Sequence, residues 1–372
     1  MGNDNSNEKE KNEENNNNKI IINIPDKNNN INNKNKKEEK VITFINTNNT
    51  CYANSIIQAL LSLKIFKEKL ISYYNANNIP KNSTLKSISE LFYIIENKKK
   101  SEVLNINDFI NIIKSNNQEF NNDDHHDAHE FLTWLLDEIE QNINSIQKKN
   151  KKNNNKNNIT NSTNTNNNNN DNFISDLFSG QQSSITKCLK CENTSEVFET
   201  FYNLSLDIET NSSLIYCLKN YFGKEILRSK DKFFCEKCNT LQEAEKKVNL
   251  IKLPKILIIQ LKRFKMKNYS NLVKLLGYVS IPKKFNANFL LKTKEEKEYN
   301  YKLKNMVIHL GQRGEYGHYF TLVNQGNNKW INFNDERYSY LSDNDIFKFF
   351  GNVDEDNNNF YYTTYLLFYE LI

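Results

Sequence analysis

The sequence lacks any apolar run that approaches membrane-spanning length, and no secretory signal pattern opens the chain. It also lacks a strong excess of one charge, because 50 Lys and Arg residues against 45 Asp and Glu residues leave a formal net charge of +5. So small and scattered an excess argues against nucleic acid as a partner. We therefore expect a soluble intracellular protein, cytoplasmic or nuclear, with no nucleic-acid partner and no stable insertion into a membrane.

Cysteine is scarce too, and four of the six cysteines form two C-x-x-C pairs, Cys188 with Cys191 and Cys235 with Cys238. In a chain without a secretory signal, this spacing favours a metal site over disulfides. Two such turns offer four thiolates in a tetrahedral array, which is a closed structural zinc site with no open position for chemistry. Four free thiols are the alternative. The sequence therefore predicts structural Zn²⁺.

Two stretches rich in Asn and Lys contain too few apolar residues to order themselves. We predict that residues 1–40 form a disordered tail and that residues from about 147 to 172 form a disordered insert in a surface loop. The first residues fit the pattern for N-myristoylation at Gly2, and a single acyl chain anchors a protein only marginally. The remaining chain is long enough to bury a substantial core.

The chain is organised around Cys51. Small amides and hydroxyls precede it, and apolar residues at helical spacing follow it from Ile56 to Leu63. Thr50 is a suitable N-cap, so we expect Cys51 in the first turn of a helix, where free backbone N–H groups favour a thiolate over a thiol. A buried structural cysteine is the plain alternative. The polar approach and the helix start together favour a nucleophile.

A base for this nucleophile occurs far downstream. Gly317 and His318 form a glycine turn that enters an apolar strand, and the next short strand ends in Asn334 and Asp335. Cys, then His, then Asn or Asp is the order of a papain-like site, in which the third residue orients the imidazole. A packed structural histidine is the alternative at His318, and sequence order alone does not exclude it.

A second cluster holds His125, His126 and His129 beside carboxylates, at the start of a predicted helix. His125 and His129 are four residues apart, which is the spacing of a metalloprotease helix. That motif, however, has Glu directly after its first histidine, and here the position is His126. A catalytic metal is therefore disfavoured.

The boxes around these residues resemble the ubiquitin-specific protease family of deubiquitinating cysteine peptidases. The cysteine box reads N-T-N-N-T-C-Y-A-N-S-I-I-Q from Asn46 to Gln58, and the histidine box comprises Tyr301, G-H-Y from Gly317, and W-I-N-F-N-D from Trp330. The resemblance runs from about Thr43 to the C-terminus and is closest to small, single-domain members that WD40-repeat partners activate.

This resemblance implies an α+β, papain-like fold in a catalytic domain spanning 41–372. A helical thumb would cover about 44–140, fingers with a zinc ribbon about 176–250, and a β-sheet palm about 250–372. The implied reaction is hydrolysis of the isopeptide or peptide bond after the C-terminal glycine of ubiquitin, with ubiquitin and ubiquitinated proteins as partners. Residues 265–276 and 311–317 are predicted to be loops beside the channel for the ubiquitin tail.

The resemblance also assigns roles to residues. Cys51 would be the nucleophile, His318 the base and then the acid, and Asn334 the residue that orients the imidazole, with Asp335 as its alternative. Asn46 would stabilise the oxyanion together with the Cys51 backbone N–H. The residues expected to bind the basic ubiquitin tail are Asp127, Glu130 and Tyr319.

The sequence departs from the family at several positions. Thr43 and Asn48 replace glycines before the cysteine, and Asn is the non-glycine residue that best takes a positive φ. His125 and His126 replace two glutamines and introduce groups that titrate near neutral pH. Two alternatives therefore stay open: a catalytically silent ubiquitin-binding module, and a protease for another ubiquitin-like modifier.

Overall fold

The computed structural model describes residues 40–157, 172–268, 271–291, 297–312, 316–352 and 361–372. Residues 1–39 of the expected tail, Gly2 among them, and residues 158–171 of the expected insert lie outside these ranges. Residues Lys40–Ile372 form one compact unit. No helix in the described ranges is long and apolar enough to cross a membrane.

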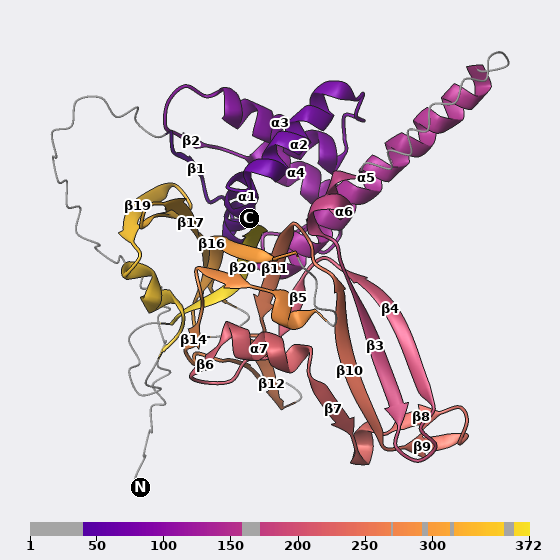
Figure 1. Cartoon of the computed structure of the whole chain (residues 1–372). Helices are drawn as coiled ribbons and strands as arrows, with labels where there is room; N and C mark the ends of the chain where they lie inside the picture. The colour runs from indigo at the N-terminus through magenta and orange to yellow at the C-terminus, as the bar shows by residue number, and fades with distance from the viewer. Residues whose placement is uncertain (1–39, 158–171, 269–270, 292–296, 313–315, 353–360) are drawn as a thin grey trace, which may run out of the picture. The chain divides into compact units, whose positions relative to one another are not determined.

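Six helices form the first half of this unit, and Figure 1 shows them gathered together. Their apolar stripes meet in one core with residues of the sheet described below, including the fully buried Phe66 and Phe131. The helices are α1 (Cys51–Leu61), α2 (Lys64–Ala76), α3 (Thr84–Asn97), α4 (Asn107–Asn116), α5 (Ala128–Asn157) and α6 (Phe173–Phe178). A short parallel pair, β1 (Ile42–Phe44) with β2 (Glu102–Leu104), edges this region.

Helix α5 differs from the sequence-based prediction at its C-terminal end. Disorder was expected from about residue 147, but the helix continues to Asn157. Its first half is anchored by the buried Phe131, Leu135 and Ile139, and each further residue adds a backbone hydrogen bond to a helix already nucleated. The expected insert therefore begins within a helix.

The second half is built on an eight-stranded sheet, called here the long sheet. Its strand order is β19-β18-β17-β16-β20-β11-β5, with β15 paired to β16. Helix α1 packs on β17, where the Thr321 hydroxyl donates to the Ser55 carbonyl at 2.7 Å. The strands are β5 (Leu204–Leu206), β11 (Ile256–Leu261), β15 (Lys284–Asn286), β16 (Asn300–Leu310), β17 (His318–Gly326), β18 (Lys329–Asn334), β19 (Arg337–Ser342) and β20 (Tyr362–Leu371).

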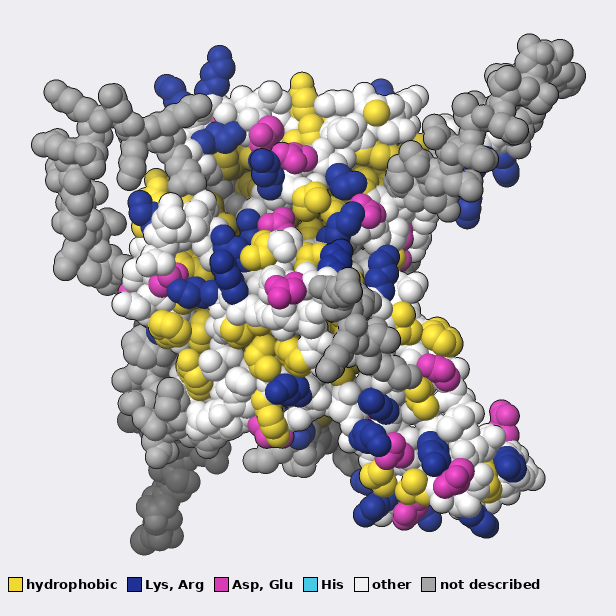
Figure 2. Space-filling model, viewed as in Figure 1, with side chains coloured by type: hydrophobic (Ala, Val, Ile, Leu, Met, Phe, Trp, Pro, Cys, Tyr) yellow, Lys and Arg dark blue, Asp and Glu magenta, His cyan; other side chains and the backbone are white. Residues whose placement is uncertain are grey.

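A four-stranded sheet of order β4-β3-β10-β7 extends away from the long sheet, and the hairpin β8–β9 lies at its far end (Figure 1). On the face drawn in Figure 2, basic and acidic side chains are interspersed, as the small net charge leads one to expect. The strands are β3 (Gly180–Cys188), β4 (Thr194–Phe201), β7 (Lys224–Leu227), β8 (Phe233–Cys235), β9 (Thr240–Gln242) and β10 (Ala244–Lys252).

Smaller elements complete the unit. The segment after position 264 was expected to be a loop, but it forms the antiparallel pair β12 (Phe264–Asn268) and β13 (Asn271–Lys274). Across this pair, Phe264 lies opposite Lys274 and Met266 lies opposite Leu272. The others are β6 (Ser212–Ser213), α7 (Leu214–Tyr221), β14 (Val279–Ser280) and the 3₁₀ turns η1 (Ser229–Asp231), η2 (Asn288–Leu290) and η3 (Asp345–Phe349).

Candidate active site

Helix α1 begins at Cys51, as predicted, and the Cys51 side chain is buried. The Thr50 carbonyl accepts the first helical bond, from the Asn54 N–H at 2.9 Å. The Thr50 hydroxyl does not cap the helix; it accepts from the Thr47 N–H at 3.2 Å instead. The Thr50 N–H donates to Asn46 Oδ1 at 2.9 Å, so the loop before the cysteine is held by its own side chains.

This loop turns through two residues of positive φ, Asn48 at 52° and Asn49 at 61°. The expectation that Asn48 tolerates the left-handed region is confirmed. Asn49 adopts the same conformation, which its sequence position did not reveal. The side chains of both residues donate hydrogen bonds to Asp123, from Asn48 to the carboxylate and from Asn49 to the carbonyl. Asparagine thus supplies both the left-handed conformation and a side chain that fastens the loop.

His318 is the first residue of β17 and lies between Cys51 and Asn334. Its Nε2 atom is 2.6 Å from Asn334 Oδ1, so Nδ1 is the ring nitrogen available to the thiol. Burial lowers the pKa of His318, but a hydrogen bond to Cys51 and the negative charges of Cys51 and Asp335 outweigh burial and raise the pKa to about 9. This surrounding therefore favours the imidazolium, the form that pairs with a thiolate and protonates a leaving group.

Asp335 follows Asn334 in a two-residue turn between β18 and β19, with a φ of 49°. Its carboxylate accepts hydrogen bonds from Asn46 Nδ2 at 2.8 Å and from Asn54 Nδ2 at 2.9 Å. Its Oδ2 atom lies 3.6 Å from His318 Nε2. Burial raises the pKa of Asp335, and the charge of His318 opposes that rise. The carboxylate therefore contacts both the loop before Cys51 and the imidazole.

The same turn holds the cysteine loop through its backbone and through Glu336. The Asn46 N–H donates to Glu336 Oε1 at 2.8 Å, and the Thr43 hydroxyl donates to the Glu336 carbonyl at 3.1 Å. The Phe44 N–H donates to the Asp335 carbonyl at 3.2 Å. Glu336 lies outside the sequence boxes, so its position in the sequence gives no sign of this role. The role of Asn54 was not predicted either, although this residue lies one helical turn after Cys51 and so shares its face.

Asp127 caps helix α5. Its Oδ1 atom accepts from the N–H groups of His129 at 2.7 Å and Glu130 at 3.1 Å. Its Oδ2 atom accepts from the hydroxyls of Tyr365 at 2.6 Å and Tyr319 at 3.3 Å. Four donors fill the acceptor sites of this carboxylate. Of the three residues expected to bind substrate, Asp127 and the buried Tyr319 are thus joined to each other.

Glu130 has a different surrounding, because its side chain is exposed at the start of α5. Partial desolvation of its carboxyl group by neighbouring residues, and then the nearby charges of Asp127 and Glu119, raise the pKa of Glu130. A cationic partner would relieve this repulsion. Glu130 is therefore the one of the three whose carboxylate faces outward.

The three histidines before and within α5 do not form a metal site. His125 precedes the helix, which begins at Ala128, so His125 and His129 do not share a helical face. His126 Nε2 lies 2.8 Å from Asn122 Oδ1, and its ring packs edge-on against Tyr52. His129 Nε2 lies 3.0 Å from Asn203 Oδ1. Each histidine has its own surroundings, which gives no support to the metalloprotease alternative.

The four cysteines of the C-x-x-C pairs converge at the end of the four-stranded sheet. Their Sγ atoms all lie within 4.8 Å of one another, and those of Cys191 and Cys235 are 3.5 Å apart. A tetrahedral ion with bonds of about 2.3 Å to sulfur sets sulfurs roughly 3.8 Å apart, which this spread brackets. Cys188 and Cys235 are buried, whereas Cys191 and Cys238 are partly exposed. These thiols fit and could hold a metal ion.

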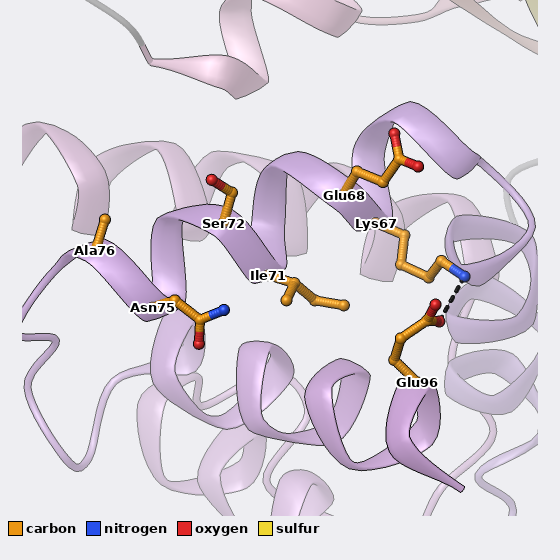
Figure 3. Close-up of a pocket in the computed structure, with 7 residues that line it drawn as sticks. All are labelled: Lys67, Glu68, Ile71, Ser72, Asn75, Ala76 and Glu96. Atoms are coloured by element: carbon orange, nitrogen blue, oxygen red, sulfur yellow. Dashed lines mark hydrogen bonds and ion pairs between the residues drawn. The ribbon is translucent and has the colours of Figure 1, made fainter. Parts of the chain in front are cut away.

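A groove elsewhere on the molecule takes no part in this chemistry. Figure 3 shows it between α2 and α3, with Ile71 on its floor and an ion pair between Lys67 and Glu96 at 2.7 Å. Neither helix contributes a residue to the cluster of Cys51, His318 and Asn334. The groove therefore does not mark the catalytic centre.

Comparison with known proteins identifies the family of this chain. Residues 42–369 match the family described as ubiquitin carboxyl-terminal hydrolase. Ubiquitin carboxyl-terminal hydrolase 4 of Arabidopsis thaliana is 35% identical over 345 residues, covering 89% of this chain and 93% of the relative. Ubiquitin carboxyl-terminal hydrolase 12 of Salmo salar is 32% identical over 337 residues, covering 89% of this chain and 90% of the relative.

Two solved structures are similar in fold. One is the SAGA Ubp8/Sgf11/Sus1/Sgf73 DUB module bound to ubiquitin aldehyde, with a TM-score of 0.69, 23% identity, and coverage of 89% of this chain and 69% of that chain. The other is the same module with a variant Ubp8 bound to monoubiquitin, with a TM-score of 0.68, 24% identity and the same coverage. The predicted α+β fold of helices, sheet and zinc-ribbon-like extension is confirmed.

Proposed function

This chain belongs to the ubiquitin carboxyl-terminal hydrolase family and is a deubiquitinating thiol protease, and from that premise we propose that Cys51, His318 and Asn334 are its catalytic triad. One observation carries the assignment: His318 interacts with Cys51 while its Nε2 atom lies 2.6 Å from Asn334 Oδ1. The order of these contacts matches the roles of nucleophile, base and orienting residue.

In the proposed mechanism, the Cys51 thiolate attacks the carbonyl carbon of the C-terminal glycine of ubiquitin. His318, having taken the thiol proton, returns a proton to the departing lysine amine, which leaves a thioester on Cys51. Water, deprotonated by His318, then hydrolyses that thioester. Asn334 accepts a hydrogen bond from the imidazole and fixes its tautomer and orientation throughout.

Asn46 would stabilise the oxyanion together with the Cys51 backbone N–H. Its Nδ2 group carries two hydrogens, and one of them is directed to Asp335 at 2.8 Å. The second hydrogen is then free to point toward the reacting carbonyl. We assign Asp335 two tasks, namely fixing the Asn46 amide and stabilising the imidazolium of His318 from 3.6 Å.

For the substrate, we propose that Glu130 contacts the basic tail of ubiquitin directly. Asp127 and Tyr319 would support that contact by fixing the start of α5 against β17, because their side chains already bond to each other. The SAGA modules of similar fold are bound to ubiquitin or ubiquitin aldehyde, which supports ubiquitin as the modifier over another of its class.

We also propose that the metal held by Cys188, Cys191, Cys235 and Cys238 is structural Zn²⁺. Four thiolates suit zinc, and the site leaves no open position for chemistry. When bound, the ion would join the β3–β4 turn to the β8–β9 hairpin and offset half of the charge of the four thiolates. The residues themselves supply the fit, since β8 ends at Cys235 and β3 ends at Cys188.

The finer organisation follows the family resemblance. We propose a thumb of about 44–140, fingers of about 176–250 and a palm of about 250–372, within a protein of the cytoplasm or nucleus. A WD40-repeat activator and myristoylation at Gly2 are carried forward as proposals that rest on the sequence alone.

The test is labelling with ubiquitin that carries a thiol-reactive group at its C-terminus. Zinc-loaded wild type should form a covalent adduct, and Cys51→Ala should form none. Cys217→Ala is the matched control, because Cys217 is a buried cysteine on α7 that the mechanism does not use, and it should label as wild type does.

The remaining outcomes separate the alternatives. An adduct that appears only when a WD40-repeat partner is added would mean a built site held inactive. Ubiquitin binding without an adduct under any condition would favour the catalytically silent module. Labelling by another ubiquitin-like modifier, with none by ubiquitin, would assign the protease to that modifier.

A further inference from the structure

Lys274 is an unusual residue in this molecule, because its amine is buried without an acidic partner among the described residues. Its side chain is 5% exposed at the end of β13. The Nζ atom donates to three backbone carbonyls, of His309 at 3.0 Å, Gly311 at 2.8 Å and Tyr361 at 2.7 Å. Three acceptors match the three hydrogens of an ammonium group.

A buried amine of this kind carries a cost. Burial, and then the charge of Arg263, lowers the pKa of Lys274. Taking an ammonium group out of water costs several kcal/mol unless hydrogen bonds and charge repay it. An apolar side chain of similar length would fill the same space without that cost. It would not, however, donate hydrogen bonds to the three carbonyls.

The three carbonyls surround the residue that pairs with the catalytic histidine. His309 and Gly311 stand on either side of Leu310, and Leu310 is paired with His318 across β16 and β17. From the other side, Leu310 is paired with Tyr362, directly after Tyr361. Lys274 therefore fastens β16 and β20 at the level of His318.

The pairing of β16 with β20 ends at this level. β16 ends at Leu310, and the next bond between these strands, from the Gly311 N–H to the Tyr361 carbonyl, is long at 3.4 Å. Gly311 has a φ of 148°, so the chain leaves the strand here in a conformation that favours glycine. The Lys274 amine thus holds the ends of β16 and β20 together where the backbone hydrogen bonds between them end.

A second contact couples the position of His309 to that of His318. The buried His309 ring packs so closely under Gly317 that a Cβ atom there would lie 2.0 Å from His309 Nε2. Gly317 directly precedes His318. A shift of the His309 backbone would therefore move the residue that presents the catalytic imidazole.

We propose that Lys274 is a positioning residue of the active site, which fixes His318 against Cys51 by holding the carbonyls of His309, Gly311 and Tyr361. This inference rests on the proposed function, since it takes His318 as the base. Misplacing a reacting group by about 1 Å can cost on the order of 100-fold in rate. Loss of the amine should therefore reduce turnover without weakening ubiquitin binding.

The test compares Lys274→Met with Lys304→Met in steady-state hydrolysis of a fluorogenic ubiquitin C-terminal amide. Met keeps most of the side-chain volume and removes the amine. Lys304 is the matched control, because it also joins β16 to β20, through an ion pair with Glu370 at 3.2 Å. We expect kcat to fall by about 10- to 100-fold in Lys274→Met with KM within about threefold, and neither to change in Lys304→Met.

A second readout reports on the Cys51–His318 pair without ubiquitin. Alkylation of Cys51 by iodoacetamide, followed at the Cys51 peptide by mass spectrometry, should change its pH dependence in Lys274→Met and keep it in Lys304→Met. If Lys274→Met does not fold, Lys274→Arg keeps a charge but presents a planar fork that cannot match three converging carbonyls, and the same losses are expected.

Two results would overturn the inference: a folded Lys274→Met with wild-type kcat, or one whose whole loss is in KM. Failure of the proposed function looks different. In that case wild type itself hydrolyses no ubiquitin amide, or His318→Ala leaves the pH dependence of Cys51 alkylation unchanged.

Discussion

Replacing Asp335 with Asn should separate the charge beside the imidazole from the hydrogen bond that orients it. Asn334 accepts the bond from His318 Nε2 and is untouched by the change. Asp335 contributes charge from 3.6 Å and accepts from both Asn46 and Asn54. Asp335→Asn removes the charge and keeps the size of the side chain. It leaves one oxygen, instead of two, to accept the hydrogen bonds from Asn46 and Asn54.

The magnitude follows from two effects. The pKa of His318 is held at about 9, with the charge of Asp335 among its causes after burial and Cys51. Loss of an opposite charge at such a distance lowers a pKa by about 1 to 2 units. At pH 7.5 this alone would lower the imidazolium fraction by about 1.3- to 4-fold. Weaker anchoring of the Asn46 amide adds about 10-fold, below the effect of deleting an oxyanion donor.

The sign is fixed by the direction of the shift. A raised pKa keeps His318 protonated at neutral pH, and the imidazolium is lost as pH rises through about 9. In Asp335→Asn the activity should therefore fall off at a pH lower by about 1 to 2 units, with kcat down by about 13- to 40-fold at pH 7.5.

The assay is the initial rate of ubiquitin-amide hydrolysis between pH 6 and pH 10. Glu336→Gln is the control, because it removes an equal charge one residue away and keeps an oxygen to accept from the Asn46 N–H. Glu336→Gln should shift the alkaline limb of the pH–rate profile only slightly. An unshifted limb in Asp335→Asn, or an equal shift in both variants, would show that the charge of Asp335 does not act on His318.

Two further predictions concern zinc and the ubiquitin tail. Purified protein should contain about one zinc per chain by elemental analysis, and Cys238→Ser should lower both zinc content and thermal stability, whereas Cys217→Ser should leave zinc content unchanged; equal zinc in both variants would contradict the site. Glu130→Gln should raise KM for the ubiquitin amide by about fivefold with kcat unchanged, since an exposed ion pair contributes up to about 1 kcal/mol. Asp137→Asn, seven residues further along α5, is its control, and a loss confined to kcat would refute a binding role.

The start of α1 and the cysteine cluster could be located from the sequence because the interactions that define them are local. A polar loop before an apolar helix predicts the start of α1, and Asn48 does take a positive φ of 52°. Likewise, two C-x-x-C turns predict convergence of their sulfurs whatever lies between them, and all four Sγ atoms lie within 4.8 Å of one another. Such residues carry their geometry within a few positions of chain.

What the sequence could not reveal depends on contacts between distant segments. Lys274 reads as one more lysine among many, and only the sheet order that places β16 beside β20 gives its amine three carbonyls. Glu336 follows a recognisable box, but its bond to Asn46 spans 290 residues. The continuation of α5 to Asn157 was not evident either, because helix propagation past the last buried Ile does not require an apolar face.

The neighbouring Asn334 and Asp335 act on His318 in different ways, one through a hydrogen bond and the other through charge. An Asp at position 334 would put a full charge within hydrogen-bonding distance of His318 and would raise the pKa of the imidazole further. The Asn334 amide orients the ring at 2.6 Å without that charge. The positive φ of Asp335 turns its carboxylate toward Asn46 and Asn54, so its charge is shared with two amides and acts on the imidazole from 3.6 Å. Orientation and charge are thereby set by separate side chains. A change at Asn334 should alter the orientation of the imidazole, whereas a change at Asp335 should alter its pKa.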